Sequence, residues 1–173
     1  MARSLRVEYE GAWYHVMNRG AAHQDVFFTE EHYDAFLKLL LEIHNRFQIE
    51  THAYCLMPNH YHLLIRTPLP NLSQAMRHLN SLYTRRFNLS TNRDGPLFRG
   101  RFKSIIVDSE AYLLRLGRYI HLNPVKAGLV RNPQQFLHSS YSFYLDPKNK
   151  PDWLFCDEIL NRFSEQDCHK EYQ

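Results

Sequence analysis

The chain has 173 residues, of which 44% are hydrophobic and 14% aromatic, enough for one compact domain with a packed core. Charged residues make up 23% without a low-complexity block, which excludes a disordered chain, a collagen-like repeat and a multidomain enzyme. No apolar run approaches the roughly 20 residues of a membrane span, and the first residues lack the apolar segment of a secretory signal. We therefore expect a cytoplasmic protein with no membrane partner.

The net charge of +3 is distributed unevenly along the chain. Residues 1–76 carry a net charge of −2, residues 77–131 a net charge of +8 and residues 132–173 a net charge of −3. Aromatic residues interleave with the arginines of the middle segment, a pattern suited to binding phosphates and stacking on bases. A solvated basic face is the alternative explanation of this charge run.

The three cysteines, Cys55, Cys156 and Cys168, lie far apart and show no Cys-x-x-Cys spacing. An odd number of cysteines in a chain without a secretory signal indicates reduced thiols. On this basis we expect no structural zinc.

The first half of the chain predicts three strands and one helix. Aromatic and β-branched residues indicate a strand over 12–18. Apolar residues at helical spacing, preceded by Thr29 as N-cap, predict a helix over 30–46. Two further strands are predicted over 49–56 and 60–67, and the short turn between them favours an antiparallel hairpin.

The second half predicts two helices and one strand, followed by weaker signals. Apolar spacing indicates a helix over 72–88, and an apolar run indicates a strand over 102–108. A third helix is predicted over 110–123, with Ser109 as N-cap and Pro124 ending it.

The order β-α-β-β-α-β followed by a helix predicts an α+β fold, with a ferredoxin-like antiparallel sheet and an added C-terminal helix. Both early helices then cover one face of the sheet, and the other face is left for a ligand or for the added helix. We predict one domain over 1–145 and a C-terminal tail over 146–173. Within these segments, 139–144 is expected to be a packed loop and 156–163 a short helix.

Two histidines on the strand 60–67 are candidates for metal binding. Because side chains alternate along a strand, His60 and His62 project to one face and Tyr61 to the other. Two imidazoles on one face can bind one metal ion. The pattern is weak by itself, because in a chain of this length with 11 histidines chance alone would give nearly one His-x-His pair.

The helix 110–123 carries a phenol and a carboxamide on one face. Tyr119 and Asn123 are four residues apart, so a nucleophile and a hard oxygen ligand would lie side by side. Arg115 and Arg118 on the same helix could hold phosphates. The alternative is that Tyr119 packs in the core and Asn123 only ends the helix; Tyr112 is a second candidate nucleophile.

Four motifs resemble a known family. Residues 56–65 (LMPNHYHLLI) resemble the His-hydrophobic-His motif of the single-strand tyrosine transposases of insertion sequences, the HUH superfamily. Residues 100–104 (GRFKS), 118–128 (RYIHLNPVKAG) and 139–141 (SSY) resemble the branch of REP-associated tyrosine transposases. The resemblance runs from about residue 6 to residue 145.

The resemblance implies a metal-dependent endonuclease and strand transferase, in which the added C-terminal helix is catalytic. His60 and His62 would correspond to the family's metal-binding pair, Asn123 to the third ligand and Tyr119 to the nucleophile, with Mg²⁺ or Mn²⁺ as the ion. The phenol would attack phosphorus and leave a free 3′-OH and a 5′-phosphotyrosine. Related insertion-sequence enzymes usually carry Gln where this chain has Asn123. His15 or His121 could also approach the metal, but His121 lies on a different helix face from Tyr119.

Family substrates are repetitive palindromic elements folded as single-stranded DNA hairpins, so the resemblance implies hairpin DNA as the partner. It also implies a bacterial, nucleoid-associated protein that acts as a monomer or a homodimer. The candidates for DNA contact are Arg77, Arg85, Arg86, Arg99, Arg101, Lys103, Arg115 and Arg118.

Two other functions fit parts of the sequence. A non-catalytic or domesticated binding module could hold hairpin DNA or RNA on the same sheet without cutting it. A two-histidine phosphoesterase would need two His-x-Ser/Thr motifs, and the chain offers one, at 138–140.

Overall fold

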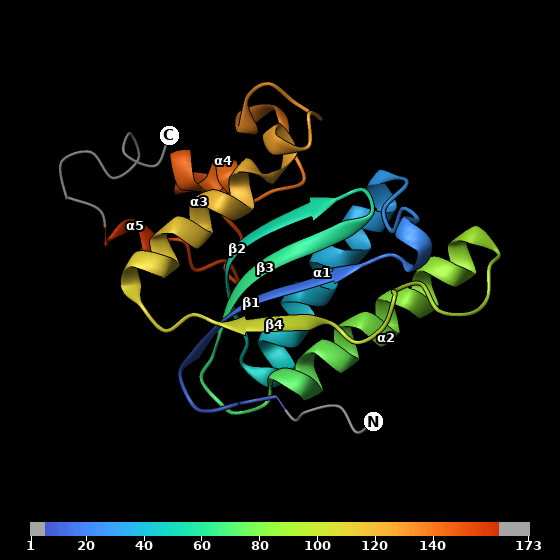
Figure 1. The fold of residues 1–173 in the computed structure, drawn as a ribbon, viewed down its shortest axis with the longest axis horizontal. Helices are drawn as coiled ribbons and strands as arrows, with labels where there is room; N and C mark the ends of the chain where they lie inside the picture. Colours follow the sequence, from blue (N-terminus) through green and yellow to red (C-terminus); the bar gives the residue numbers. More distant parts are fainter. Residues whose placement is uncertain (1–5, 163–173) are drawn as a thin grey trace.

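A four-stranded antiparallel sheet forms the middle layer of the computed structural model, which describes residues 6–162 (Figure 1). Its strands are β1 (Ala12–Arg19), β2 (Glu50–Met57), β3 (His60–Thr67) and β4 (Lys103–Ile106), in the order β2-β3-β1-β4. This order, with the helices between the strands, confirms the predicted ferredoxin-like α+β fold.

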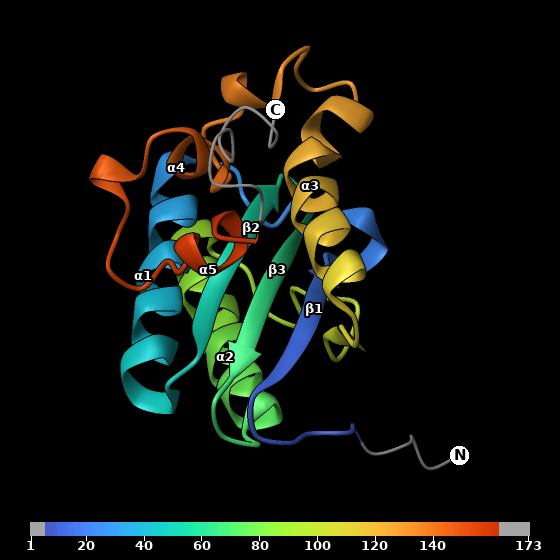
Figure 2. The ribbon, with the colours of Figure 1, turned by 90° about the vertical axis from the view of Figure 1, so that its left-hand side faces the viewer.

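Helices cover both faces of this sheet (Figure 2). The helices α1 (Glu30–Phe47) and α2 (Leu72–Thr91) pack against each other on one face. The added helix α3 (Glu110–Lys126) lies on the other face, against β2 and β3. Each face therefore has its own apolar core. No helix among the described residues is long and apolar enough to cross a membrane.

The alternation of the central strands separates the two cores. Val16 of β1 lies opposite Leu63 of β3, and both belong to the core under α1 and α2. The next pair, Met17 and His62, therefore projects toward the face of α3. Tyr61 belongs to the first core, so the predicted alternation of Tyr61 with its neighbouring histidines is confirmed.

The prediction that Pro124 ends the third helix is wrong, because α3 continues through it to Lys126. Proline has no N–H to donate to the carbonyl group four residues earlier, which here belongs to Ile120. The side chain of Asn123 compensates, since its Nδ2 donates to the carbonyl oxygens of Tyr119 (2.8 Å) and Ile120 (3.3 Å).

Two further boundaries differ from the prediction. The segment 139–144, predicted as a packed loop, contains the short helix α4 (Tyr141–Leu145). The strand predicted over 102–108 is shorter, because β4 pairs with β1 over four residues alone. The helix α5 (Asp157–Leu160) lies inside the predicted tail; residues 163–173, with Cys168, and residues 1–5 lie outside the described residues. The boundary at 145 stays a prediction.

The strand β2 lies at the edge of the sheet, where one side of its backbone has no neighbouring strand. The segment after α3 covers this edge. The N–H of Leu56 donates to the carbonyl oxygen of His138 (2.9 Å), and the N–H of Phe155 donates to that of Thr51 (2.9 Å). Between them, the N–H of Tyr54 donates to the Oγ of Ser140 (2.9 Å). The C-terminal segment therefore protects this edge from pairing with another chain.

Replacing Ser140 by Ala should lower the free energy of unfolding by about 1–3 kcal/mol, because the buried N–H of Tyr54 loses its acceptor. Urea unfolding at neutral pH measures this change. Ser142→Ala, at an exposed position two residues further on, is the matched control and should stay within about 0.5 kcal/mol of wild type. Equal stabilities of the two variants would contradict the role of Ser140.

Candidate active site

Three histidines gather on the face of the sheet that α3 covers. His60 and His62 come from β3, where they lie opposite Arg19 and Met17 of β1. His15 comes from β1, two residues before Met17, and therefore projects to the same face. The rings of His15 and His62 stack with centroids 5.1 Å apart, and the ring of His60 is 5.0 Å from that of His62.

Hydrogen bonds determine which ring nitrogens are available to a metal. The Nδ1 of His60 lies 2.6 Å from the Oδ1 of Asn59, an acceptor, so Nδ1 carries the proton and Nε2 offers a lone pair. The Nδ1 of His62 lies 2.9 Å from the Nε2 of His15. If His62 donates this bond, its Nε2 is likewise free to ligate, the usual arrangement for metal-binding histidines.

Burial keeps these three imidazoles neutral. Loss of hydration lowers the pKa of His15 to about 4. The same effect, with a smaller contribution from the nearby Arg19, lowers the pKa of His60 to about 4. For His62, burial and then the neighbouring His15, His60 and Arg19 lower the pKa to about 3. Because a metal binds the neutral imidazole, the site needs no deprotonation at neutral pH.

Tyr119 lies beside these histidines although it comes from α3. Its ring stands edge-on to that of His62, with centroids 5.9 Å apart, and edge-on to that of His15, at 6.1 Å. The side chain is 40% exposed, so the alternative that Tyr119 packs in the core is wrong. The Nζ of Lys126 lies 4.6 Å from the ring centroid. A substrate can therefore reach this phenol.

Asn123 follows Tyr119 by one turn of α3. Its Nδ2 is used within the helix, as described above, which leaves Oδ1 as the atom that could ligate a cation. His121 points elsewhere: it is buried and its Nε2 lies 2.7 Å from the Oγ of Ser140. The structure thus brings Tyr119 close to His62 and leaves His121 out of the site.

A basic cleft of about 500 Å³ opens next to the histidines. The segment after α2 forms one wall, held against β1 by the N–H of Arg99, which donates to the carbonyl oxygen of Arg19 (2.9 Å). The Nδ2 of Asn18 also donates to the carbonyl oxygen of Gly100 (3.2 Å). None of the described lining residues is acidic. The lining residues are Met17, Asn18, Arg19, His60, His62, Arg99, Gly100, Arg101 and Lys103.

All eight basic residues predicted to contact DNA are exposed, but they lie in three places. One group lines the cleft beside the histidines, a second lies on α3, and a third lies on α2 in the layer on the opposite face of the sheet. Arg86 of the third group pairs with Glu42 at 3.7 Å. The groups are Arg99, Arg101 and Lys103; Arg115 and Arg118; and Arg77, Arg85 and Arg86.

Two residues of this site carried little signal in the sequence. His15 could be named as one of two extra histidines, but only the register of β1 against β3 places it beside His62. Arg19 ends β1 and enters the cleft because it lies opposite His60. The alternation of residues 12–18 suggests which side chains share a face, although it does not identify the neighbouring strand.

Comparison with known proteins identifies the class of protein that this fold and site define. Residues 8–123 match the family model of IS200-like transposases, and the chain belongs to this family. It is 28% identical over 106 residues to a Haemophilus influenzae protein named as a REP-associated tyrosine transposase. This match covers 55% of the chain and 60% of that relative.

The fold is similar to that of a REP-associated tyrosine transposase solved in complex with a REP hairpin. The TM-score is 0.71 at 18% sequence identity, over 87% of this chain and 89% of the other. The resemblance seen in the motifs is thereby confirmed, and the arrangement of sheet and helices is shared.

Acid should destabilise the fold from about pH 6.5 downward. His15 has a folded-state pKa of about 4, below its ordinary value of 6.5, so the unfolded chain binds more protons in this range. One such histidine contributes a slope of up to about 1.4 kcal/mol per pH unit, and this stability is lost as the pH falls toward 4.

Urea unfolding of His15→Gln between these pH values measures that contribution as a flatter pH dependence than in wild type. His23→Gln is the control, because His23 is exposed, and it should keep the wild-type slope. A wild-type slope in His15→Gln would show that His15 is not held neutral.

Proposed function

We propose that this protein is a metal-dependent single-stranded DNA endonuclease and strand transferase that acts on palindromic hairpin DNA through a 5′-phosphotyrosine intermediate. The observation that carries the proposal is the position of the exposed Tyr119 beside His62, which lines a basic cleft together with His60. The solved relative bound to a REP hairpin and the family of the chain support the same substrate class.

The donor set suits a divalent cation. The Nε2 atoms of His60 and His62 and the Oδ1 of Asn123 are the atoms that would hold it. Two nitrogen ligands favour Mn²⁺ over Mg²⁺, and the amide oxygen is a ligand for either ion. When bound there, such a cation would polarise the scissile phosphate and stabilise its developing charge.

Tyr119 would be the nucleophile of the reaction. Its Oη forms a bond to phosphorus while the bond from phosphorus to the 3′ oxygen breaks, and the leaving oxygen keeps the electron pair. The phenol loses one proton and the 3′ oxygen gains one, so the products are a 3′-OH and a 5′-phosphotyrosine. Because this ester replaces an ester of similar energy, an incoming 3′-OH can reverse the step and join two strands without a nucleotide cofactor.

The cleft would hold the strand that leads to the scissile phosphate. Arg99, Arg101 and Lys103 present cations from one wall, and Arg19 presents another from β1. Such contacts attract the backbone without reading its sequence. Arg115 and Arg118 are exposed on α3, outside the cleft lining, and are candidates for further contacts with the DNA.

Tyr119→Phe should abolish the covalent adduct with labelled hairpin DNA in Mn²⁺ or Mg²⁺ and leave hairpin binding intact. Denaturing gels that follow label on the protein measure this. His60→Ala should also lose the adduct, and Tyr112→Phe, on the same helix, should keep it. Binding without an adduct in the wild-type protein, on hairpins from beside its own gene, would favour a non-catalytic binding module.

Arg101→Ala and Lys103→Ala should weaken hairpin binding and make it less dependent on salt. Each lost phosphate contact reduces the slope of log K against log salt by about 0.7–0.9. Fluorescence anisotropy at several salt concentrations measures both effects. Arg77→Ala is the matched control, since Arg77 lies near the start of α2 on the opposite face of the sheet. Equal losses in all three variants would mean that the DNA does not follow the cleft.

A further inference from the structure

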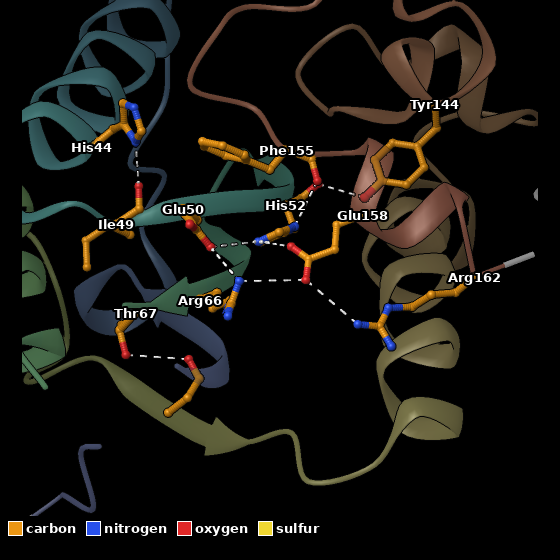
Figure 3. Close-up of polar contacts among 11 residues, drawn as sticks. His44, Ile49, Glu50, His52, Arg66, Thr67, Tyr144, Phe155, Glu158 and Arg162 are labelled. Atoms are coloured by element: carbon orange, nitrogen blue, oxygen red, sulfur yellow. Dashed lines mark hydrogen bonds and ion pairs between the residues drawn. The ribbon is translucent and has the colours of Figure 1, made fainter. Parts of the chain in front are cut away.

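A second group of potential metal ligands lies where the C-terminal segment packs against β2 (Figure 3). Glu50 and His52 come from β2, and Glu158 comes from α5. One ligand atom from each lies within 4.8 Å of the other two. We call these three residues the carboxylate–histidine triad. None of them belongs to the histidine site beside Tyr119.

A β-bulge in β2 lies at His52, the histidine of the triad. The pairing with β3 passes from Thr51 opposite Ile65 to Ala53 opposite Leu64, so His52 has no partner on β3. Bulges recur where a strand redirects a side chain. The imidazole of His52 lies under Trp13 instead, with ring centroids 4.1 Å apart.

The imidazole of His52 directs a lone pair at the two carboxylates. Its Nδ1 lies 2.8 Å from the carbonyl oxygen of Phe155, which can only accept, so Nδ1 carries the proton. The ring is fully buried, and Nε2 has no hydrogen-bond partner among the described residues. The Oε2 of Glu50 lies 3.7 Å and the Oε2 of Glu158 lies 3.8 Å from this Nε2. Arg66 pairs with both carboxylates, whereas the lone pair of the His52 Nε2 has no donor among the described residues, and a metal ion would satisfy it.

The distances fit a shared ion better than a direct ion pair. An N–H···O bond from a protonated His52 would bring the atoms to about 2.7–3.2 Å. Ligands about 2.1 Å from a tetrahedral zinc are about 3.4 Å apart, close to the separations found here.

Two arginines also contact the carboxylates of the triad. The Oε1 of Glu158 lies 3.8 Å from the Nη1 of Arg66 and 3.8 Å from the Nη2 of Arg162, so Oε2 is the oxygen that faces His52. Arg66 also lies 3.5 Å from the Oε2 of Glu50. Figure 3 shows Arg66 bridging Glu50 and Glu158, and Arg162 reaching Glu158 from just after α5. A metal ion at the triad would use the free Oε2 of Glu158 and would share the Oε2 of Glu50 with Arg66.

We propose that Glu50, His52 and Glu158 bind one Zn²⁺ ion, which fastens α5 to β2. Zinc accepts imidazole nitrogen and carboxylate oxygen as ligands, which are the donors that this triad offers. The ion would add to the backbone bonds that hold the C-terminal segment along the edge of the sheet. This proposal is independent of the proposed function, because it involves none of the residues assigned to DNA cleavage.

Equilibrium dialysis of the full chain against Zn²⁺, followed by elemental analysis, tests the proposal. Since His60 and His62 can also bind zinc, the quantity compared is the difference between variants. Glu158→Gln should bind one ion fewer than wild type. Glu110→Gln removes another carboxylate that pairs with Arg162, lies outside the triad, and should keep the wild-type count. Glu50→Gln should repeat the loss if Glu158→Gln folds poorly.

The complementary measurement is thermal unfolding with and without Zn²⁺ in His60→Ala/His62→Ala. This double variant should still bind one ion and melt at a higher temperature with zinc. Equal zinc counts in wild type, Glu158→Gln and Glu50→Gln would overturn the proposal. The triad would then be an ion-pair cluster that holds no metal.

Discussion

The antiparallel pairing of β1 with β3 places Val16 opposite Leu63 and Met17 opposite His62, and the rest of the structure depends on this register. Along both strands, successive side chains alternate between the core under α1 and α2 and the face that α3 covers. A slip by one residue would bury His62 in the apolar core and expose Tyr61, so core and site are specified together. The same register places His15 within hydrogen-bond distance of His62, and this contact orients the ring of His62, a candidate metal ligand.

The helix α3 adds the part of the site that the sheet cannot supply. It passes over β2 and β3 and presents Tyr119 edge-on to His62. Its continuation through Pro124 depends on the amide of Asn123, whose nitrogen bonds the carbonyl groups of its own helix. One side chain therefore supports the helix through its nitrogen, and its oxygen is left for the proposed metal.

The C-terminal segment is hydrogen-bonded to the edge of the sheet at β2. Backbone bonds at Leu56 and Thr51 close the open edge of β2, and Ser140 adds a side-chain contact between them. The bulge at His52 lies in the same strand, at the point where α5 approaches. The prediction of no structural zinc was based on the spacing of the cysteines alone. Cysteine spacing gives no information on carboxylates and histidines that the fold brings together from distant segments. Edge protection and the proposed ion would act on the same junction.

Local pattern was enough to predict the strands, the three long helices, the order of the fold and the shared face of His60 and His62. These features depend on alternation, helical spacing and caps, which act over a few residues. The end of α3 was missed because the compensation for Pro124 comes from a side chain. Tertiary structure alone decided that His15 meets His62, that Arg99 rather than Arg77 lines the cleft, and that Glu158 meets His52. The physical reason is that these meetings depend on strand register and on the packing of segments far apart in the chain, which no short window of sequence contains.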